Sequence, residues 1–186
     1  KRSYADRILR NNRQYLKDIV VTGLGSAEAK QDSVTKKSIL YGITANYETV
    51  RNTKAEKGRW FDDNEDQKSK RVVLLGPGIA EELFGNVDPV NKNIKLDGRN
   101  YKVLGVLEEK GGGFGGPSFD NYIYLPLDTL FDDFNTDLID SFVIEVKDQN
   151  QIDDAIAGIE KDLLRDLEDD EFTVFERKAC ESNVCD

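Results

Sequence analysis

Carboxylates are the side chains of this sequence with the clearest potential for chemistry. Asp and Glu number 36, against 26 Lys and Arg, and histidine is absent. Adjacent acidic pairs recur along the chain, at Asp132/Asp133, Asp153/Asp154 and Asp169/Asp170. Acid–base catalysis needs two carboxylates held across a cleft in different environments. Nothing in the spacing places these pairs in a cleft, so we expect an exposed acidic surface and no catalytic residues.

A calcium-loop spacing begins at Asp62 and continues at Asn64 and Asp66. An EF-hand loop also needs glycine at its sixth position and glutamate at its twelfth. This sequence has Gln67 and Val73 there. The segment is therefore predicted to be an exposed acidic loop, and no metal site is expected.

A glycine-containing turn, Gly76-Pro77-Gly78, lies where a dinucleotide-binding fingerprint would lie, between a strand and a helix. The position of the third glycine is taken by Glu81, whose carboxylate would repel a pyrophosphate at the helix N-terminus. No GxxxxGK[ST] phosphate-binding sequence occurs. We therefore expect no nucleotide cofactor in this chain, and a tight strand-to-helix turn at this position.

The absence of histidine also excludes Ser-His-Asp and Cys-His catalysis and histidine-ligated zinc. The two cysteines, Cys180 and Cys185, lie close together near the C-terminal end. Their spacing differs from the CxxC redox motif. A local disulfide between them and a pair of free thiols are both compatible with the sequence.

The net charge of −10 argues against nucleic acid as a partner, because an acidic surface repels phosphates. Aromatic residues make up 9% of the chain, which favours a folded domain over disorder. No apolar run approaches the roughly 20 residues of a membrane span. The start, Lys1-Arg2-Ser3, lacks the apolar region of a signal peptide. We expect a segment of a longer protein.

Hydrophobic periodicity predicts an α+β fold. Helices are expected over residues 3–17, 79–84 and 150–167. Strands are expected over residues 19–22, 38–44, 71–75, 93–96, 100–107, 121–125, 141–147 and 172–175. A charged loop is expected over residues 62–70. Gly23 and Gly25 are expected to stop the first strand, Gly85 to end a helix, and Asp97-Gly98 to form a hairpin turn.

From Gly58 onward the sequence resembles the periplasmic core domain of MacB-like ABC-transporter permeases. The motifs that carry the resemblance are residues 58–61, 72–76, 80–85, 88–90, 102–107 and 122–127, with residues 41–47 upstream. One departure is Asn91, where the family usually has glycine. Asparagine tolerates the left-handed backbone conformation, so the turn is expected to survive.

The resemblance implies two lobes. A porter-like α/β lobe would be built from both chain ends, residues 1–57 and 136–186. A strand-rich lobe, residues 58–135, would be inserted between them. The alternation of helices and strands at the two ends fits this layout.

The resemblance also implies a non-catalytic domain on the extracytoplasmic face of the bacterial cytoplasmic membrane. It would couple ATP hydrolysis in a separate cytoplasmic ATPase mechanically to the export of a substrate. Expected partners are a second copy of the permease and a periplasmic adaptor protein. An extracytoplasmic peptide- or lipid-binding or sensory module, without transport, is the alternative.

Partner-contact residues are expected near the tip of the inserted lobe, at Phe114 and Phe119. Phe114 lies in a glycine-rich loop over residues 111–116. A single phenylalanine in such a loop either packs into the core or protrudes toward a partner.

Overall fold

The computed structural model describes residues 2–110, 118–136, 139–168 and 171–174. Its helices are α1 (Arg2–Asn11), α2 (Tyr47–Val50), α3 (Asp63–Gln67), α4 (Pro77–Phe84), α5 (Leu127–Phe134) and α6 (Ile152–Leu163), with short 3-10 helices η1 (Phe119–Asn121) and η2 (Gln149–Gln151). Its strands are β1 (Leu16–Gln31), β2 (Val34–Ile43), β3 (Ala55–Gly58), β4 (Val72–Leu75), β5 (Asn93–Leu96), β6 (Arg99–Leu107), β7 (Tyr122–Pro126) and β8 (Ile139–Val146).

The strands form one mixed sheet that closes on itself. Its order is β2-β7-β4-β6-β5-β1-β8, and β1 also pairs with β2, so six of these strands form a continuous ring. The β2–β7 and β4–β6 pairs are parallel, and the other pairs are antiparallel. β3 pairs with β6, and β8 pairs with β1, outside the ring.

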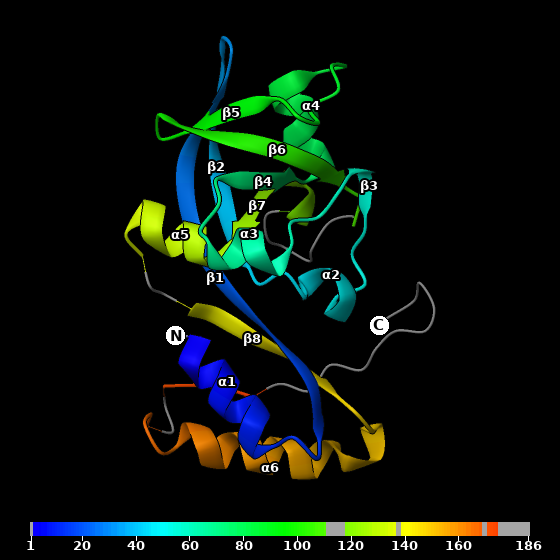
Figure 1. The fold of residues 1–186 in the computed structure, drawn as a ribbon, viewed down its shortest axis with the longest axis vertical. Helices are drawn as coiled ribbons and strands as arrows, with labels where there is room; N and C mark the ends of the chain where they lie inside the picture. Colours follow the sequence, from blue (N-terminus) through cyan, green and yellow to red (C-terminus); the bar gives the residue numbers. More distant parts are fainter. Residues whose placement is uncertain (1, 111–117, 137–138, 169–170, 175–186) are drawn as a thin grey trace.

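β1 is the longest strand, and it links the two ends of the molecule (Figure 1). Its first half pairs with β8, and its second half pairs with β2 and β5. The prediction that Gly23 and Gly25 stop this strand is wrong, because both lie inside the β1–β2 ladder. A Cβ on Gly25 would lie 2.9 Å from the side chain of Leu130 on α5. The lack of a side chain at this position therefore lets α5 pack closely against the sheet.

The hydrophobic core has three clusters. One lies between the ring and helices α4 and α5, and a second is rich in aromatic rings and lies under α2 and the segment after β3. The third lies between α1, α6 and the β1–β8 pair. Figure 1 shows α6 and α1 stacked at one end of the molecule, with β8 between them and the ring.

Several expected elements are confirmed. Gly76 is the N-cap of α4, Pro77 occupies its first turn, and Gly85 follows its last residue with a φ of 58°. β5 and β6 are joined by the Asp97-Gly98 turn. Asn91 has a φ of 65°, which is the left-handed conformation expected there.

Three further expectations are wrong, and one helix was not expected. α1 ends at Asn11, short of residue 17, because a turn must precede the start of β1. The charged segment over residues 62–70 contains α3, whose capping box joins Asp62 and Glu65. No element was predicted where α5 lies. Residues 172–174 carry no strand hydrogen bonds.

The mixed α/β character agrees with the predicted fold class. The predicted lobe boundaries at residues 57/58 and 135/136 stay a prediction. Among the described residues, no helix combines the length and the apolar character that crossing a membrane requires.

Candidate functional site

Helices α1 and α6, the first and the last helix of the described residues, pack against each other. α1 leads into β1, and β8 leads into α6, so the third core cluster brings these early and late elements together. Ile8 of α1 is fully buried there, together with Ala155 and Ile159 of α6. The two helices therefore share one apolar core.

A buried carboxylate, Asp162, joins α6 to α1. Its side chain accepts hydrogen bonds from Asn12 Nδ2 at 2.7 Å and from Asn11 Nδ2 at 2.9 Å. Asp162 and Asn12 are only 4% and 5% exposed. A carboxylate so removed from water needs such donors, because the unpaired charge would be costly to bury. The contact therefore specifies how the two helices fit together.

Asn12 is held from two sides, and a glycine makes room for it. Asn12 lies directly after the last residue of α1, and its Nδ2 also donates to the Ile8 carbonyl at 3.0 Å. A Cβ on Gly158 of α6 would lie 2.1 Å from Asn12 Oδ1. The absence of a side chain at Gly158 is thus required for Asn12 to reach Asp162.

Further polar contacts extend this junction. Arg7 donates to the Asp162 carbonyl at 3.2 Å, forms an ion pair with Asp166, and lies 5.0 Å from the centre of the Tyr4 ring. Directly after the last residue of β8, Lys147 Nζ donates to the Arg13 carbonyl at 2.6 Å. We name the contacts of Arg7, Asn11 and Asn12 with Asp162 and Asp166 the end clasp.

A second polar network fixes α5 to the ring. Arg71 donates from Nε and a terminal nitrogen to the two oxygens of Asp133, at 2.7 and 2.8 Å, and the Tyr101 hydroxyl donates to the same carboxylate at 2.7 Å. The hydrogen bonds from Arg71 lower the pKa of Asp133. Desolvation and the adjacent carboxylate raise the pKa of Tyr101. The network positions α5 and offers no free acid or base.

The aromatic core cluster places a group of tyrosines beside Trp60. Tyr41 contacts both Tyr47 and Tyr124 edge-on, and Tyr47 stacks on Trp60 with ring centres 6.0 Å apart. Burial raises the pKa of Tyr41 to about 12. These hydroxyls stay protonated at neutral pH, so the cluster contributes packing and no acid–base chemistry.

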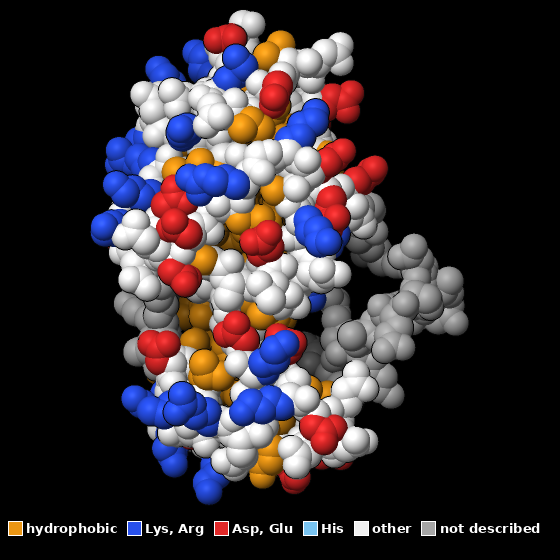
Figure 2. Space-filling model, turned by 45° about the vertical axis from the view of Figure 1, so that its right-hand side comes forward, with side chains coloured by type: hydrophobic (Ala, Val, Ile, Leu, Met, Phe, Trp, Pro, Cys, Tyr) orange, Lys and Arg blue, Asp and Glu red, His pale blue; other side chains and the backbone are white. Residues whose placement is uncertain are grey.

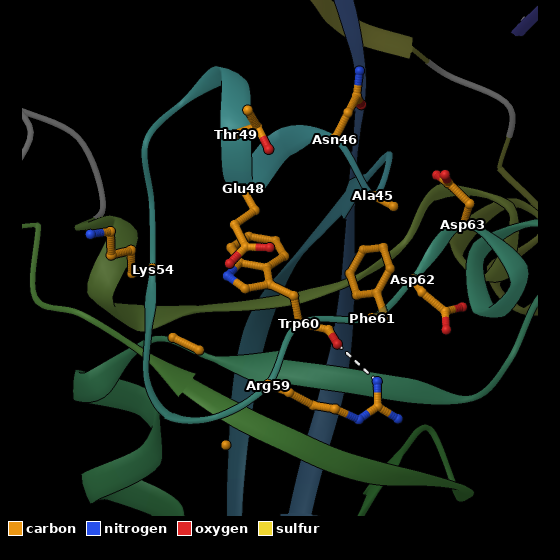
Figure 3. A pocket seen from close by; sticks show the side chains of 12 residues that line it. Ala45, Asn46, Glu48, Thr49, Lys54, Arg59, Trp60, Phe61, Asp62 and Asp63 are labelled. Atoms are coloured by element: carbon orange, nitrogen blue, oxygen red, sulfur yellow. Dashed lines mark hydrogen bonds between the residues drawn. The ribbon is translucent and has the colours of Figure 1, made fainter.

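A depression of about 820 Å³ lies over this cluster, between α2, β3 and the start of α3 (Figure 3). Trp60 and Phe61 form its apolar side, and Glu48, Lys54 and Asp63 lie around it. Figure 2 shows one face of the molecule, where acidic and basic side chains are interspersed with narrow apolar strips.

The residues singled out for metal or nucleotide chemistry have structural roles. Asp62 caps α3 by accepting from the Glu65 amide at 2.8 Å. Cβ atoms on Gly76 and Gly78 would lie 2.3 Å from the Asp120 carbonyl and 2.2 Å from Asn121 Oδ1. The turn before α4 is thus covered by this chain's own η1 segment, where a phosphate would have to lie. Within the described ranges, no group of three or more metal-ligating side chains comes together.

Of the predicted contact residues, Phe119 lies on η1 and is 38% exposed, with its ring packed edge-on against Tyr122. Phe114, Cys180 and Cys185 lie outside the described residues. The structure does not test their predicted roles.

Sequence reasoning missed the end clasp and the depression. A signal for the clasp exists: Asp162 follows Ile159 by three positions, on the apolar face of its helix, where an acidic residue needs a partner. Asn12, the partner, lies in a segment that was expected to continue as helix. The sequence around Trp60 carries no pattern that indicates the depression.

These features define a class: an α+β domain on a closed mixed sheet, with its first helix packed on its last described helix. The model of the MacB-like periplasmic core domain family matches residues 3–162. The chain belongs to this family.

Curated relatives support the family membership. A macrolide export ATP-binding/permease protein MacB from Bdellovibrio bacteriovorus is 30% identical over 154 residues, which are 82% of this chain and 24% of that protein. The pyoverdine export protein PvdT of Pseudomonas syringae is 27% identical, over 77% of this chain and 22% of its own length. The chain thus spans about a quarter of these relatives.

Two solved domains share the fold. The periplasmic region of MacB from Actinobacillus actinomycetemcomitans superposes with a TM-score of 0.76 at 20% identity, over 89% of this chain and 72% of that one. The extracellular domain of the noncanonic ABC-type transporter YknZ from Gram-positive bacteria superposes with a TM-score of 0.71 at 25% identity, over 82% of this chain and 76% of that one. The predicted fold class, with its porter-like lobe, is confirmed.

Proposed function

We propose that this chain is the extracytoplasmic domain of an export permease and transmits movement from membrane helices to the exported substrate. ATP hydrolysis in a separate cytoplasmic ATPase would move those helices. The domain itself makes and breaks no bonds. Its partners would be a second permease copy, the ATPase and a periplasmic adaptor protein.

The observation that carries the proposal is the end clasp, in a chain that belongs to the periplasmic core domain family. A domain that passes on a movement applied at its ends must hold those ends to each other and to its body. Asp162 and Asn12 join the end helices, and β1 runs from that junction into the closed ring. Hydrogen-bonded sheets and packed helices transmit displacement because their interiors are close-packed.

The export names of the relatives support the direction of transport. Two of them are described as macrolide and pyoverdine export proteins. These substrates differ in chemistry, so they support export as the shared activity and leave the substrate of this transporter open.

Sequencing the gene on both sides of this segment tests the permease proposal. We expect one apolar stretch of roughly 20 residues before Lys1 and three after Asp186, as a four-helix permease requires. An ATPase with a GxxxxGK[ST] motif should be encoded in the same or a neighbouring frame. A secretion signal before the segment and a stop codon after it would instead favour a free binding or sensory module.

A further inference from the structure

The indole of Trp60 carries a hydrogen-bond donor that the described part of the chain leaves unused. Trp60 is 8% exposed, and its Nε1 is buried and has no hydrogen-bond partner. A buried N–H without an acceptor costs about 1–3 kcal/mol, so native proteins rarely keep one without a reason. Figure 3 shows the indole nitrogen on the side of the ring toward Lys54, in the depression that both residues line.

The Trp60 ring is packed between aromatic neighbours, which restrict its rotation. Tyr47 stacks on it at an interplanar angle of 29°, and Phe61 packs against it at 53°. Arg59 donates to the Trp60 carbonyl at 2.8 Å and binds both oxygens of Glu65, so the backbone is fixed as well. The donor is therefore preorganised, which lowers the entropic cost of binding an acceptor.

The depression also borders a free strand edge. β3 pairs only with β6 among the described strands, and its residues Ala55 and Gly58 line the depression. An unpaired edge can accept a further extended strand through main-chain hydrogen bonds. A carbonyl of such a strand is an acceptor suited to Trp60 Nε1.

Charge indicates the composition of that strand. Glu48 and Asp63 line the depression, are exposed, and form no ion pair with another described residue. The guanidinium of Arg59 is neutralised by Glu65, which leaves Lys54 as the free cation of the lining. The free charge is therefore mainly negative, and it attracts lysine or arginine.

We propose that the depression around Trp60 binds an extended, basic segment of a partner protein. The segment adds to the free edge of β3 and displaces the lining side chains that cover Trp60 Nε1, so that one of its carbonyls accepts from this nitrogen. Its cationic side chains pair with Glu48 and Asp63. A second copy of this chain is a poor occupant, because it brings the same acidic surface and a net charge of −10. This inference is independent of the transport proposal.

The chain contains a single tryptophan, so its fluorescence reports on this site alone. The probes are a capped pentapeptide of alternating lysine and valine, its glutamate counterpart, and spermidine, which supplies charge without a peptide backbone. We expect a saturable change of Trp60 emission with the lysine peptide only. No change up to millimolar peptide, or equal binding of either other probe, overturns the proposal.

Variants separate the proposed contacts. Glu48→Gln with Asp63→Asn should weaken the lysine peptide about fivefold, since exposed ion pairs are individually weak. Asp153→Asn with Asp154→Asn removes the same charge from the first turn of α6 and should leave affinity unchanged. Equal weakening by both double variants would indicate only non-specific attraction and would overturn the site.

The indole hydrogen bond needs its own test. Trp60→Phe keeps an aromatic ring and lacks the N–H, and calorimetry should show about fivefold weaker binding of the lysine peptide, as expected for one neutral hydrogen bond. A thermal unfolding midpoint close to that of the parent chain confirms that the variant folds. Unchanged affinity in a folded variant overturns the role of Nε1. Sedimentation that shows dimers, lost on Glu48→Gln with Asp63→Asn, would overturn the choice of partner.

Discussion

Asn12 and Asp162 are 150 positions apart in the sequence, yet their side chains meet in the interior at 2.7 Å. Asn12 follows the first helix, and Asp162 lies in the last turn of α6. Each is almost inaccessible to solvent. The pair therefore joins α1 to α6, and its energetics can be measured directly.

Replacing Asp162 with alanine should destabilise the domain by about 3 kcal/mol, because two amide donors lose a buried charged acceptor. Urea unfolding of the isolated chain measures this loss. Asp153→Asn, an acidic residue in the exposed first turn of the same helix, serves as the control and should change stability by less than about 0.5 kcal/mol. Equal effects of both substitutions would contradict the special role of Asp162.

Gly158→Ala should be destabilising, although alanine is normally the better helix former. The added Cβ would lie 2.1 Å from Asn12 Oδ1, and Asn12 is pinned by two hydrogen bonds, so a loss of about 1–3 kcal/mol is expected. In an Asn12→Ala background the obstruction is gone, and the same change should stabilise by about 1 kcal/mol. Thermal unfolding of the parent chain, the two single variants and the double variant decides between these signs.

The elements that sequence reasoning found are those with local signals. The Asp97-Gly98 hairpin, the turn at Asn91 and the α4 unit with its glycine end each depend on residues a few positions apart. Backbone conformation at such positions follows from the residue type itself. They were confirmed with nearly correct bounds.

The elements that it missed depend on distant residues. Gly23 and Gly25 were expected to stop the first strand, but both lie in the β1–β2 ladder, and Leu130 of α5 packs over Gly25 and over Gly42 of the neighbouring strand. A Cβ on Gly42 would lie 2.6 Å from that leucine side chain. This contact could not be derived from the local pattern around either glycine. The same holds for the partner of Asp162.

Phe119→Ala, and Phe114→Ala with it, should leave folding intact and weaken export or partner binding in the whole transporter. The fold around Phe119 depends on its carbonyl, which accepts from the Tyr124 hydroxyl at 3.1 Å, and this contact survives the substitution. Its half-exposed ring contributes little to the core. Unfolding temperatures measure the first claim, and export by the whole transporter of a substrate that the parent sequence is first shown to export measures the second. Undiminished export with both residues altered would refute the predicted contact.

Asp133 should make stability depend on acid pH. Its pKa is lowered in the folded state by Arg71, so its contribution is fully present above the unfolded pKa of about 3.9 and is lost as pH falls through the folded value. Asp133→Asn should therefore be less stable than the parent chain at pH 7, and the gap should narrow below about pH 4. Urea unfolding across this range checks the trend. A gap that stays constant would show that the ionised carboxylate is not what stabilises α5.

Tyr41 should produce the opposite dependence in alkali. Burial raises its pKa to about 12, so the folded chain holds this proton more tightly than the unfolded chain, where the pKa is about 10. The resulting stability is present below pH 10 and is lost as pH rises toward 12. Tyr41→Phe removes the ionisable group, so its stability should fall less steeply over this window than that of the parent chain. Thermal unfolding at closely spaced pH values measures both slopes, with absorbance at the phenolate band reporting ionisation. Identical slopes would mean that the remaining buried tyrosines, among them Tyr47 and Tyr124, whose pKa values are also raised by burial, account for the alkaline transition.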